Sequence, residues 1–225
     1  MQTINIVAAA ITVVAALAAF IRMWQCMRRG TVRPNLFTWF VWAILAIALL
    51  KSEYEAIGAT WALSLLFNDL GCISFTALAL SIQTIRNFSK LRENQSQTKK
   101  EWCQKNAVEL GCLAAIAVAT TVWWQTSSAL VALVCYLMID FTAVIPTLYA
   151  VWGDYTTEDL FEWILFQVAN TAVIFTVSEF TFEQLAYPVT VCAIALAVNV
   201  VRAISYRRYM RQKTRQELPV ARAIV

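Results

Sequence analysis

Seven apolar segments dominate the chain, and each approaches the length needed to cross a membrane. A spanning helix takes about 20 residues to cross a hydrocarbon core of about 30 Å. Charged residues make up 14% of the 225 residues, against about a quarter in a soluble domain. We therefore expect an all-α, polytopic membrane protein whose first partner is the lipid bilayer. The seven predicted transmembrane helices lie near residues 4–25, 35–51, 57–83, 106–124, 127–151, 159–177 and 183–205.

The basic residues predict how these helices are oriented. Lys and Arg collect in cytoplasmic loops. With the N-terminus outside, nearly every Lys and Arg between the apolar segments falls on the inner side, and Lys51 is the exception. Trp39 and Trp163 then lie near the inner interface, and Trp61 and Trp123 near the outer one, which is typical of an aromatic belt. We expect an N-terminus outside and a C-terminus in the cytoplasm.

One helix–loop–helix pattern occurs twice. Residues 16–39 and 140–163 align at an offset of 124 residues, and in both copies Leu-Phe-x-Trp follows a loop of equal length. The aligned identities are Ile21/Ile145, Leu36/Leu160, Phe37/Phe161, Trp39/Trp163 and Ala48/Ala172. We predict two three-helix repeats joined by a linking helix. The predicted parts are a first repeat at 1–83, a cytoplasmic linker and linking helix at 84–124, a second repeat at 125–206 and a basic cytoplasmic tail at 207–225.

This plan resembles the SWEET and PQ-loop transporters, and the bacterial nicotinamide riboside transporters are similar in plan. Pro146-Thr147 occupies the place of that family's second Pro-Gln dipeptide, and Arg22 stands at the equivalent place in the first copy. RPNLFTWFVW together with DFTAVIPT also looks like a group of uncharacterised bacterial integral membrane proteins. The resemblance implies a transporter of a small molecule or ion in the plasma (inner) membrane of a bacterium. Its two halves would rock about a central site.

Two acidic residues lie near the middle of predicted membrane helices. Asp69 is on the third and Asp140 on the fifth. Ionisable groups at this depth are expensive to bury and mark functional sites. If both face one cavity, the pair could bind a cation or carry a coupling proton. The alternative is that each serves a local hydrogen-bond network between helices or faces water.

Three amides and one tryptophan complete the candidate binding residues. The resemblance implies substrate contacts from asparagines on the third and seventh helices, where Asn68 and Asn199 stand. Asn170 lies in the middle of the sixth helix, and Trp42 lies about one turn deeper than Trp39. The alternative for the amides is helix-to-helix hydrogen bonding, at about 0.6 kcal/mol each.

The two predicted inner loops differ in charge. The first carries Arg28 and Arg29, and the second carries Asp154 and Glu158. If a pseudo-twofold axis relates the copies, these loops could meet as a salt-bridged inner gate, with Pro146 as a hinge. The alternative is a pair of solvated loops, in which such ion pairs contribute about 0–1 kcal/mol.

Several kinds of chemistry find no support in the sequence. The chain has no His, and its six Cys form no C-x-x-C pair, so we expect no metal site and no cofactor. No nucleophile motif or phosphate loop is present, and we expect neither an enzyme nor a nucleic-acid partner. The main alternative to a transporter is a non-transporting oligomeric scaffold, channel or effector subunit. An intramembrane enzyme that uses the aspartates is a third. Another copy could cover the apolar outer surface as well as lipid can, so a homo-oligomer is a further expectation.

Overall fold

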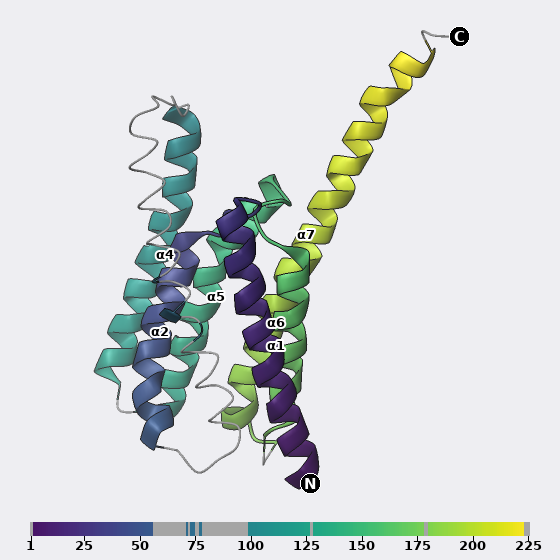
Figure 1. Ribbon diagram of the computed structural model, residues 1–225. Coiled ribbons are helices and arrows are strands. Elements are labelled where there is room, and N and C mark those ends of the chain that lie inside the picture. The colour runs from purple at the N-terminus through teal and green to yellow at the C-terminus, as the bar shows by residue number, and fades with distance from the viewer. Residues whose placement is uncertain are drawn as a thin grey trace.

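The computed structural model describes residues 2–55, 71, 73–74, 77, 99–126, 128–177 and 180–222, and their regular structure is entirely helical. Six of the seven predicted segments correspond to described helices (Figure 1). The third prediction, 57–83, falls mostly outside the described residues, as do Asn68 and Asp69. The helices are α1 (Gln2–Arg29), α2 (Leu36–Glu55), α4 (Lys99–Gln125), α5 (Ala129–Gly153), α6 (Leu160–Ile174) and α7 (Phe182–Arg222).

Four described helices are long and apolar enough to cross a membrane. They are Ile4–Arg29, Ala107–Gln125, Leu130–Gly153 and Phe182–Arg215. Shorter apolar stretches occur at Leu36–Ala46 and Leu160–Ile174. Large apolar side chains are exposed on the outside of the bundle, including Val14, Phe40, Leu113, Phe161 and Leu196. Helices that are apolar both inside and outside are suited to lipid, so the fold is compatible with a multi-pass membrane protein.

The helices form two packed groups. In one group α1 packs on α6 and α6 on α7, and in the other α2 and α4 pack on α5. Contacts between α5 and α7 join the groups. The N-terminus lies at one end of the bundle, and α7 extends well beyond the other end (Figure 1).

The loop after α1 and the loop after α5 have the same length. The first joins Arg29 to Leu36 and the second joins Gly153 to Leu160, an offset of 124 residues at both ends. The loops also end in the same way, because each following helix has an N-cap side chain. Asn35 Oδ1 accepts from the Thr38 N–H at 3.3 Å, and Asp159 Oδ1 accepts from the Glu162 N–H at 3.0 Å.

The same offset relates two helix contacts. At an offset of 124 residues, α1 aligns with α5 and α2 aligns with α6. The α1–α6 contact therefore has the α2–α5 contact as its counterpart. This pattern of contacts is the one that the predicted repeat would produce. The candidate site lies between these four helices and α7.

Glycine ends α1 for a backbone reason. Gly30 has φ 73°, a left-handed conformation that costs L-residues with a side chain more than glycine. The Gly30 N–H donates to the Met27 carbonyl and the Thr31 N–H to the Cys26 carbonyl, each at 3.0 Å. These two bonds form a Schellman motif, which satisfies carbonyls at the helix end and turns the chain toward α2.

The α2–α5 contact contains a buried chain of hydroxyl groups. Thr147 Oγ1 donates to Thr38 Oγ1 at 2.9 Å, and Thr38 Oγ1 donates to the Ala143 carbonyl at 2.6 Å. Pro146 is buried within α5 next to this chain. Because proline has no N–H, it leaves the Thr142 carbonyl without its usual helical donor. This weakens the α5 backbone where α2 crosses it, which is a suitable place for a hinge.

The basic tail is part of α7. The predicted seventh helix ended near 205, but the helix continues without a break to Arg222. Arg, Lys, Gln and Glu are good helix formers, and the segment after Ser205 contains no glycine. The hydropathy of the tail marks where the apolar part ends, but it does not mark the end of the helix.

Candidate functional site

A cavity lies between α1, α2, α5, α6 and α7. It contains about 600 Å³ of empty space, including space open to the surroundings, of which about 70 Å³ can hold the centres of water molecules. A single water needs roughly 10–15 Å³ by that measure, so the site can hold a small occupant. The lining residues are Phe20, Trp39, Trp42, Leu45, Ala46, Tyr136, Asp140, Trp163, Phe166, Asn170, Tyr187, Val191, Ile194 and Ala195.

Four aromatic residues in the cavity wall form two matched pairs. Trp39 corresponds to Trp163 and Trp42 to Phe166 at the offset of 124 residues. Within each copy the ring centroids are 5.2 Å apart for Trp39–Trp42 and 5.7 Å for Trp163–Phe166. Between copies they are 6.1 Å apart for Trp39–Phe166 and 6.4 Å for Trp42–Trp163. Tilted and edge-on rings at these separations attract each other, so the two copies share one aromatic cluster.

Asp140 is the only carboxylate among the described residues that line the cavity. It is 5% exposed and lies on α5 between the neighbouring aromatic rings. The Trp42 indole is close enough to interact with it. However, neither Trp42 Nε1 nor Asp140 Oδ2 makes a hydrogen bond of ordinary geometry within the described part of the chain. The cavity therefore contains a carboxylate oxygen whose hydrogen-bonding capacity is unused by the described protein groups.

The two predicted amides of α6 and α7 both join these helices. Asn170 lines the cavity, and its Nδ2 donates to the Val191 carbonyl at 3.3 Å. Asn199 Nδ2 donates to the Trp163 carbonyl at 3.1 Å, and Asn199 is not one of the cavity-lining residues. Asn170 thus belongs to the candidate site. The hydrogen bond from Asn199 joins α7 to α6 at Trp163.

The third predicted segment approaches the cavity through a glycine. A Cβ added at Gly71 would lie 2.3 Å from Phe20 Cε2, closer than any ordinary contact, so the backbone at Gly71 packs directly against this ring. Phe20 is itself part of the cavity wall. The predicted site residues Asn68 and Asp69 precede Gly71 and lie outside the described residues.

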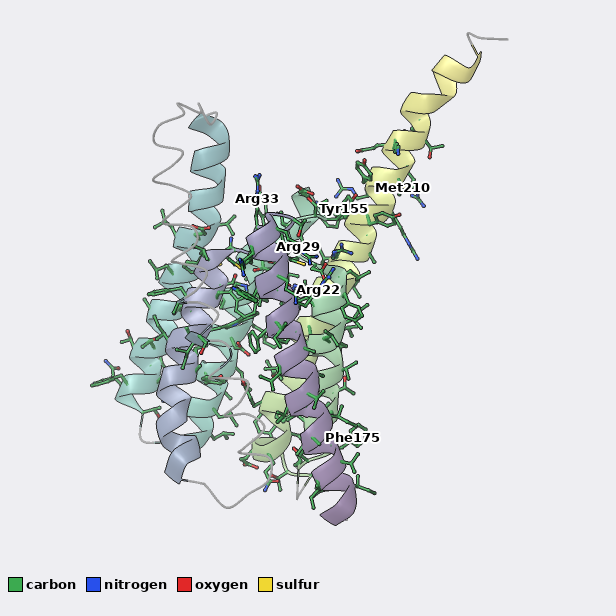
Figure 2. All side chains as sticks on the ribbon, in the orientation of Figure 1. Arg22, Arg29, Arg33, Tyr155, Phe175 and Met210 are labelled. Carbon is green, nitrogen blue, oxygen red and sulfur yellow. The ribbon has the colours of Figure 1, made fainter. Side chains whose placement is uncertain are left out.

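A second polar cluster lies at the end of the bundle where α1 and α5 end. Arg22 Nε and Nη2 donate to the two carboxylate oxygens of Asp159 at 3.2 and 3.1 Å. The loops also touch through the backbone, because the Arg33 N–H donates to the Thr157 carbonyl at 2.9 Å. Figure 2 shows Arg22, Arg29, Arg33 and Tyr155 toward this end of the bundle and Phe175 toward the other. The two loops predicted to form a gate therefore meet.

Two further carboxylates are buried beside this ion pair. Glu158 is 2% exposed and Glu162 is fully buried. The Trp163 indole N–H donates to Glu158 Oε2 at 3.1 Å, and Arg202 Nε donates to the Glu158 backbone carbonyl at 2.9 Å. Both carboxylate oxygens of Glu162 lack a hydrogen-bond partner among the described residues.

The two acids of the loop differ in how they ionise. Burial raises the pKa of Glu158 to about 7, although hydrogen bonds and Arg202 oppose this shift. Burial would also raise the pKa of Asp159, but hydrogen bonds from Arg22 and the Glu162 N–H, with the charge of Arg22, lower it below its usual value. Adjacent residues therefore divide into a charged partner of arginine and an acid that titrates near neutrality.

The predicted gate residues occupy other places in this cluster. Arg28 lies over the Trp24 ring, with its guanidinium carbon 5.0 Å from the ring centroid, and Arg29 is exposed. Asp154 is exposed and accepts from the Thr156 N–H and hydroxyl. Arg22 and Asp159 form the one ion pair between the described side chains. The sequence did contain a signal for Asp159, because it aligns with the N-cap residue Asn35.

Comparisons with protein-family models, with curated proteins and with solved structures find no match to this chain.

Proposed function

We propose that this protein is a transporter of a small solute, with seven transmembrane helices arranged as two three-helix repeats and a linking helix. Alternating access to the central cavity is the proposed mechanism. We also propose a bacterial inner membrane, with the N-terminus outside and the C-terminus in the cytoplasm. The equal loops and the exchange of the α1–α6 and α2–α5 contacts support the repeat.

The observation that carries the proposal is the position of the cavity. It lies between the helix contacts that exchange under the offset, and it contains a buried carboxylate whose Oδ2 has no described hydrogen-bond partner. Ionisable groups in the membrane mark substrate or ion pathways. A rocking movement of the two halves would loosen the contacts on one side of the cavity while tightening them on the other.

The inner cluster supports the same mechanism as a gate. The Arg22–Asp159 pair ties α1 to the loop before α6, and the Arg33–Thr157 bond ties the two loops together. These contacts close the end of the bundle toward which the two loops project. Opening this end requires the ion pair to separate, whereas the aromatic cluster can remain intact within each half. Pro146 removes one backbone hydrogen bond from α5 without interrupting the helix, and it is the proposed hinge between the two regions.

Uptake into proteoliposomes tests the proposal. Purified protein is screened against mixtures of labelled amines, sugars, nucleosides and amino acids, alongside Asp140→Asn and the control Glu183→Gln. Glu183 is exposed in the first turn of α7. Its replacement by Gln makes the same carboxylate-to-amide change outside the cavity. We expect accumulation of at least one solute class by the native protein and by the control, with at least a tenfold loss in Asp140→Asn. Equal accumulation by all three proteins, or by empty liposomes, would contradict transport through this cavity.

The second candidate is a non-transporting oligomeric scaffold, channel or effector subunit, and the exposure of α4 favours it. Most described side chains of α4 are exposed, including Leu110, Leu113, Val118 and Trp124. Lipid or another copy could cover this face. Native mass spectrometry from detergent distinguishes them: a monomer that transports supports the first proposal. An oligomer without uptake activity in any solute class supports the second.

A further inference from the structure

The walls of the central cavity combine aromatic rings with a single described acid. Half of the lining residues are aromatic, and most of the others are aliphatic. No described basic residue lines the cavity. Arg22 is paired with Asp159, and Arg202 donates to the Glu158 backbone. No described side chain therefore balances the charge of Asp140.

A buried carboxylate without a counter-charge is costly. The partner can be a proton or a cation, and the rest of the wall distinguishes between kinds of cation. A calcium ion takes six to eight oxygen ligands and magnesium a near-ideal octahedron. The described lining offers one carboxylate and one amide, Asn170, whose Nδ2 already donates to Val191. Such a wall replaces few of the waters that a hydrated metal ion would have to lose.

The same wall is poorly suited to a sugar. Sugars present many hydroxyl groups, and each buried hydroxyl needs a hydrogen-bond partner. An aromatic wall provides few such partners, but the faces of Trp and Tyr rings attract an organic cation. Trp39, Trp42 and Trp163 lie around the cavity with centroids 5.2–6.4 Å apart in the Trp39–Trp42 and Trp42–Trp163 pairs. Tyr136 and Tyr187 form a further pair, 5.5 Å apart, on the α5–α7 side.

We propose that the central cavity binds a compact organic cation, such as a quaternary ammonium or a protonated alkylamine, with its charge against Asp140 and its alkyl groups against the aromatic rings. As a statement about the transported solute, this inference rests on the proposed transport function. As a statement about binding, it stands separately. The cation supplies a positive counter-charge for the Asp140 carboxylate, and its alkyl surface needs no hydrogen bonds from the wall.

The offset explains why the site is asymmetric. Asp140 corresponds to Ala16 in the first copy, and Ala16 is buried against Ala169. Two aromatic positions of the wall, Trp39/Trp163 and Trp42/Phe166, are therefore matched across the offset, but Asp140 is not. An occupant with one positive charge fits this arrangement better than one with two.

Direct binding of tritiated choline to purified protein in nanodiscs tests the proposal. The decisive competitor is the dimethylbutanol isostere, in which a carbon atom replaces the ammonium nitrogen and only the charge is lost. We expect unlabelled choline and tetramethylammonium to displace the label at concentrations at least roughly tenfold lower than the isostere does. Equal displacement by the uncharged isostere, or no saturable choline binding by folded protein, would overturn the proposal.

Variants locate the bound charge. We expect Asp140→Asn to weaken choline binding at least roughly tenfold, and Trp42→Leu to weaken it more than Trp42→Phe, which keeps a ring. Glu183→Gln is the matched control. Unchanged affinity in Asp140→Asn would place the site elsewhere. If that variant does not fold, the isostere comparison on the native protein decides.

The two proposals fail in different ways. Saturable choline binding without uptake would end the transport proposal and leave the cation site standing. Uptake of a neutral or anionic solute that depends on Asp140, without choline binding, would support transport and overturn the cation proposal.

Discussion

Carboxylates at the centre of the bundle and at its proposed inner end differ in their hydrogen-bond partners. At the centre, Asp140 lies among aromatic rings, and its Oδ2 has no hydrogen-bond partner in the part of the chain described. At the inner end, Asp159 receives two hydrogen bonds from Arg22. A buried acid paired with arginine supports a particular packing of helices. An acid that lines a cavity without such a partner is available to a ligand, whereas the buried Glu162 at the other end does not line the central cavity. The comparison supports the proposals of binding at the centre and closure at the inner end.

Trp163 connects the two regions. Its ring is part of the central aromatic cluster, and its indole N–H donates to Glu158 in the inner cluster. Asn199 holds its backbone carbonyl from α7. A change of state at either region can therefore be transmitted through this residue, and substitutions here test whether the regions act together.

Replacement of Trp163 should have the largest effect. Trp163→Ala removes a buried ring from the cavity wall and the hydrogen bond to Glu158, and we expect a loss of about 3–5 kcal/mol in stability. Trp163→Phe keeps most of the ring and loses the hydrogen bond, so we expect a loss of about 1–3 kcal/mol. Thermal unfolding in detergent measures both. Equal losses in the two variants would mean that ring packing contributes nothing beyond the hydrogen bond.

The inner end should respond to pH through Glu158. Burial raises its pKa from 4.5 to about 7, so the folded protein holds a proton that the unfolded chain releases. The contribution of Glu158 to stability is then highest below about pH 4.5, falls as the pH rises to about 7 and is lost above it. The total fall is on the order of 3 kcal/mol.

The variant Glu158→Gln should flatten this dependence, and Asp154→Asn, a loop change at an exposed acid, should leave it intact. Asp159 has a lowered pKa and acts in the opposite direction, because its contribution is lost when the pH falls. Unfolding temperatures measured at pH 4.5, 6 and 7.5 check the sign. A Glu158→Gln profile as steep as that of the native protein would show that Glu158 is not the titrating group.

Separation of the Arg22–Asp159 pair should have a smaller effect on stability and a specific effect on the gate. The side chains are 37% and 17% exposed, so solvent screens their attraction, and we expect Arg22→Gln to cost about 1 kcal/mol. The exchanged double variant Arg22→Asp with Asp159→Arg should recover part of this. In uptake assays the single variant should leak or lose directionality. If reagents on the cytoplasmic side reach the cavity equally well in native protein and in Arg22→Gln, the pair does not close the gate.

Gly71→Ala should act on the centre and leave the inner end unchanged. The added Cβ would lie 2.3 Å from Phe20 Cε2, so the ring has to move into or away from the cavity. We expect a change in ligand affinity, together with an unchanged pH profile at the inner end. Gly111→Ala is a suitable control, since an added Cβ there has no neighbour within 4 Å. Equal ligand affinity in both variants and the native protein would show that Phe20 does not shape the site.

The sequence predicted the helices and loops well because apolar length and turn residues are local properties. The six described helices lie where the apolar segments indicated, and the loops after α1 and α5 have equal lengths. Asp159 caps α6 just before the Leu-Phe-x-Trp sequence. The predicted end of the seventh helix was wrong, because a solvated basic helix has no apolar signal.

The partners of the site residues could not be predicted, because they depend on packing between distant segments. Arg22 and Asp159 are 137 residues apart in sequence. Arg28 and Arg29 were equally plausible partners by charge, but α1 directs Arg22 toward α6 and places Arg28 over Trp24. Asp140, Asn170 and Trp42 do line one cavity, whereas Asn199 lies outside its lining. Asn68 and Asp69 stay predictions, since they are outside the described residues.

The most direct test of the account is whether the cavity opens to each side of the membrane in turn. Ala46 lines the cavity and is 2% exposed. Ala46→Cys is made in a protein whose six native cysteines are replaced. Membrane-impermeant thiol reagents are then applied to one side of oriented vesicles at a time. We predict labelling from either side and protection by choline. Labelling from neither side, or from one side only, would contradict alternating access through this cavity.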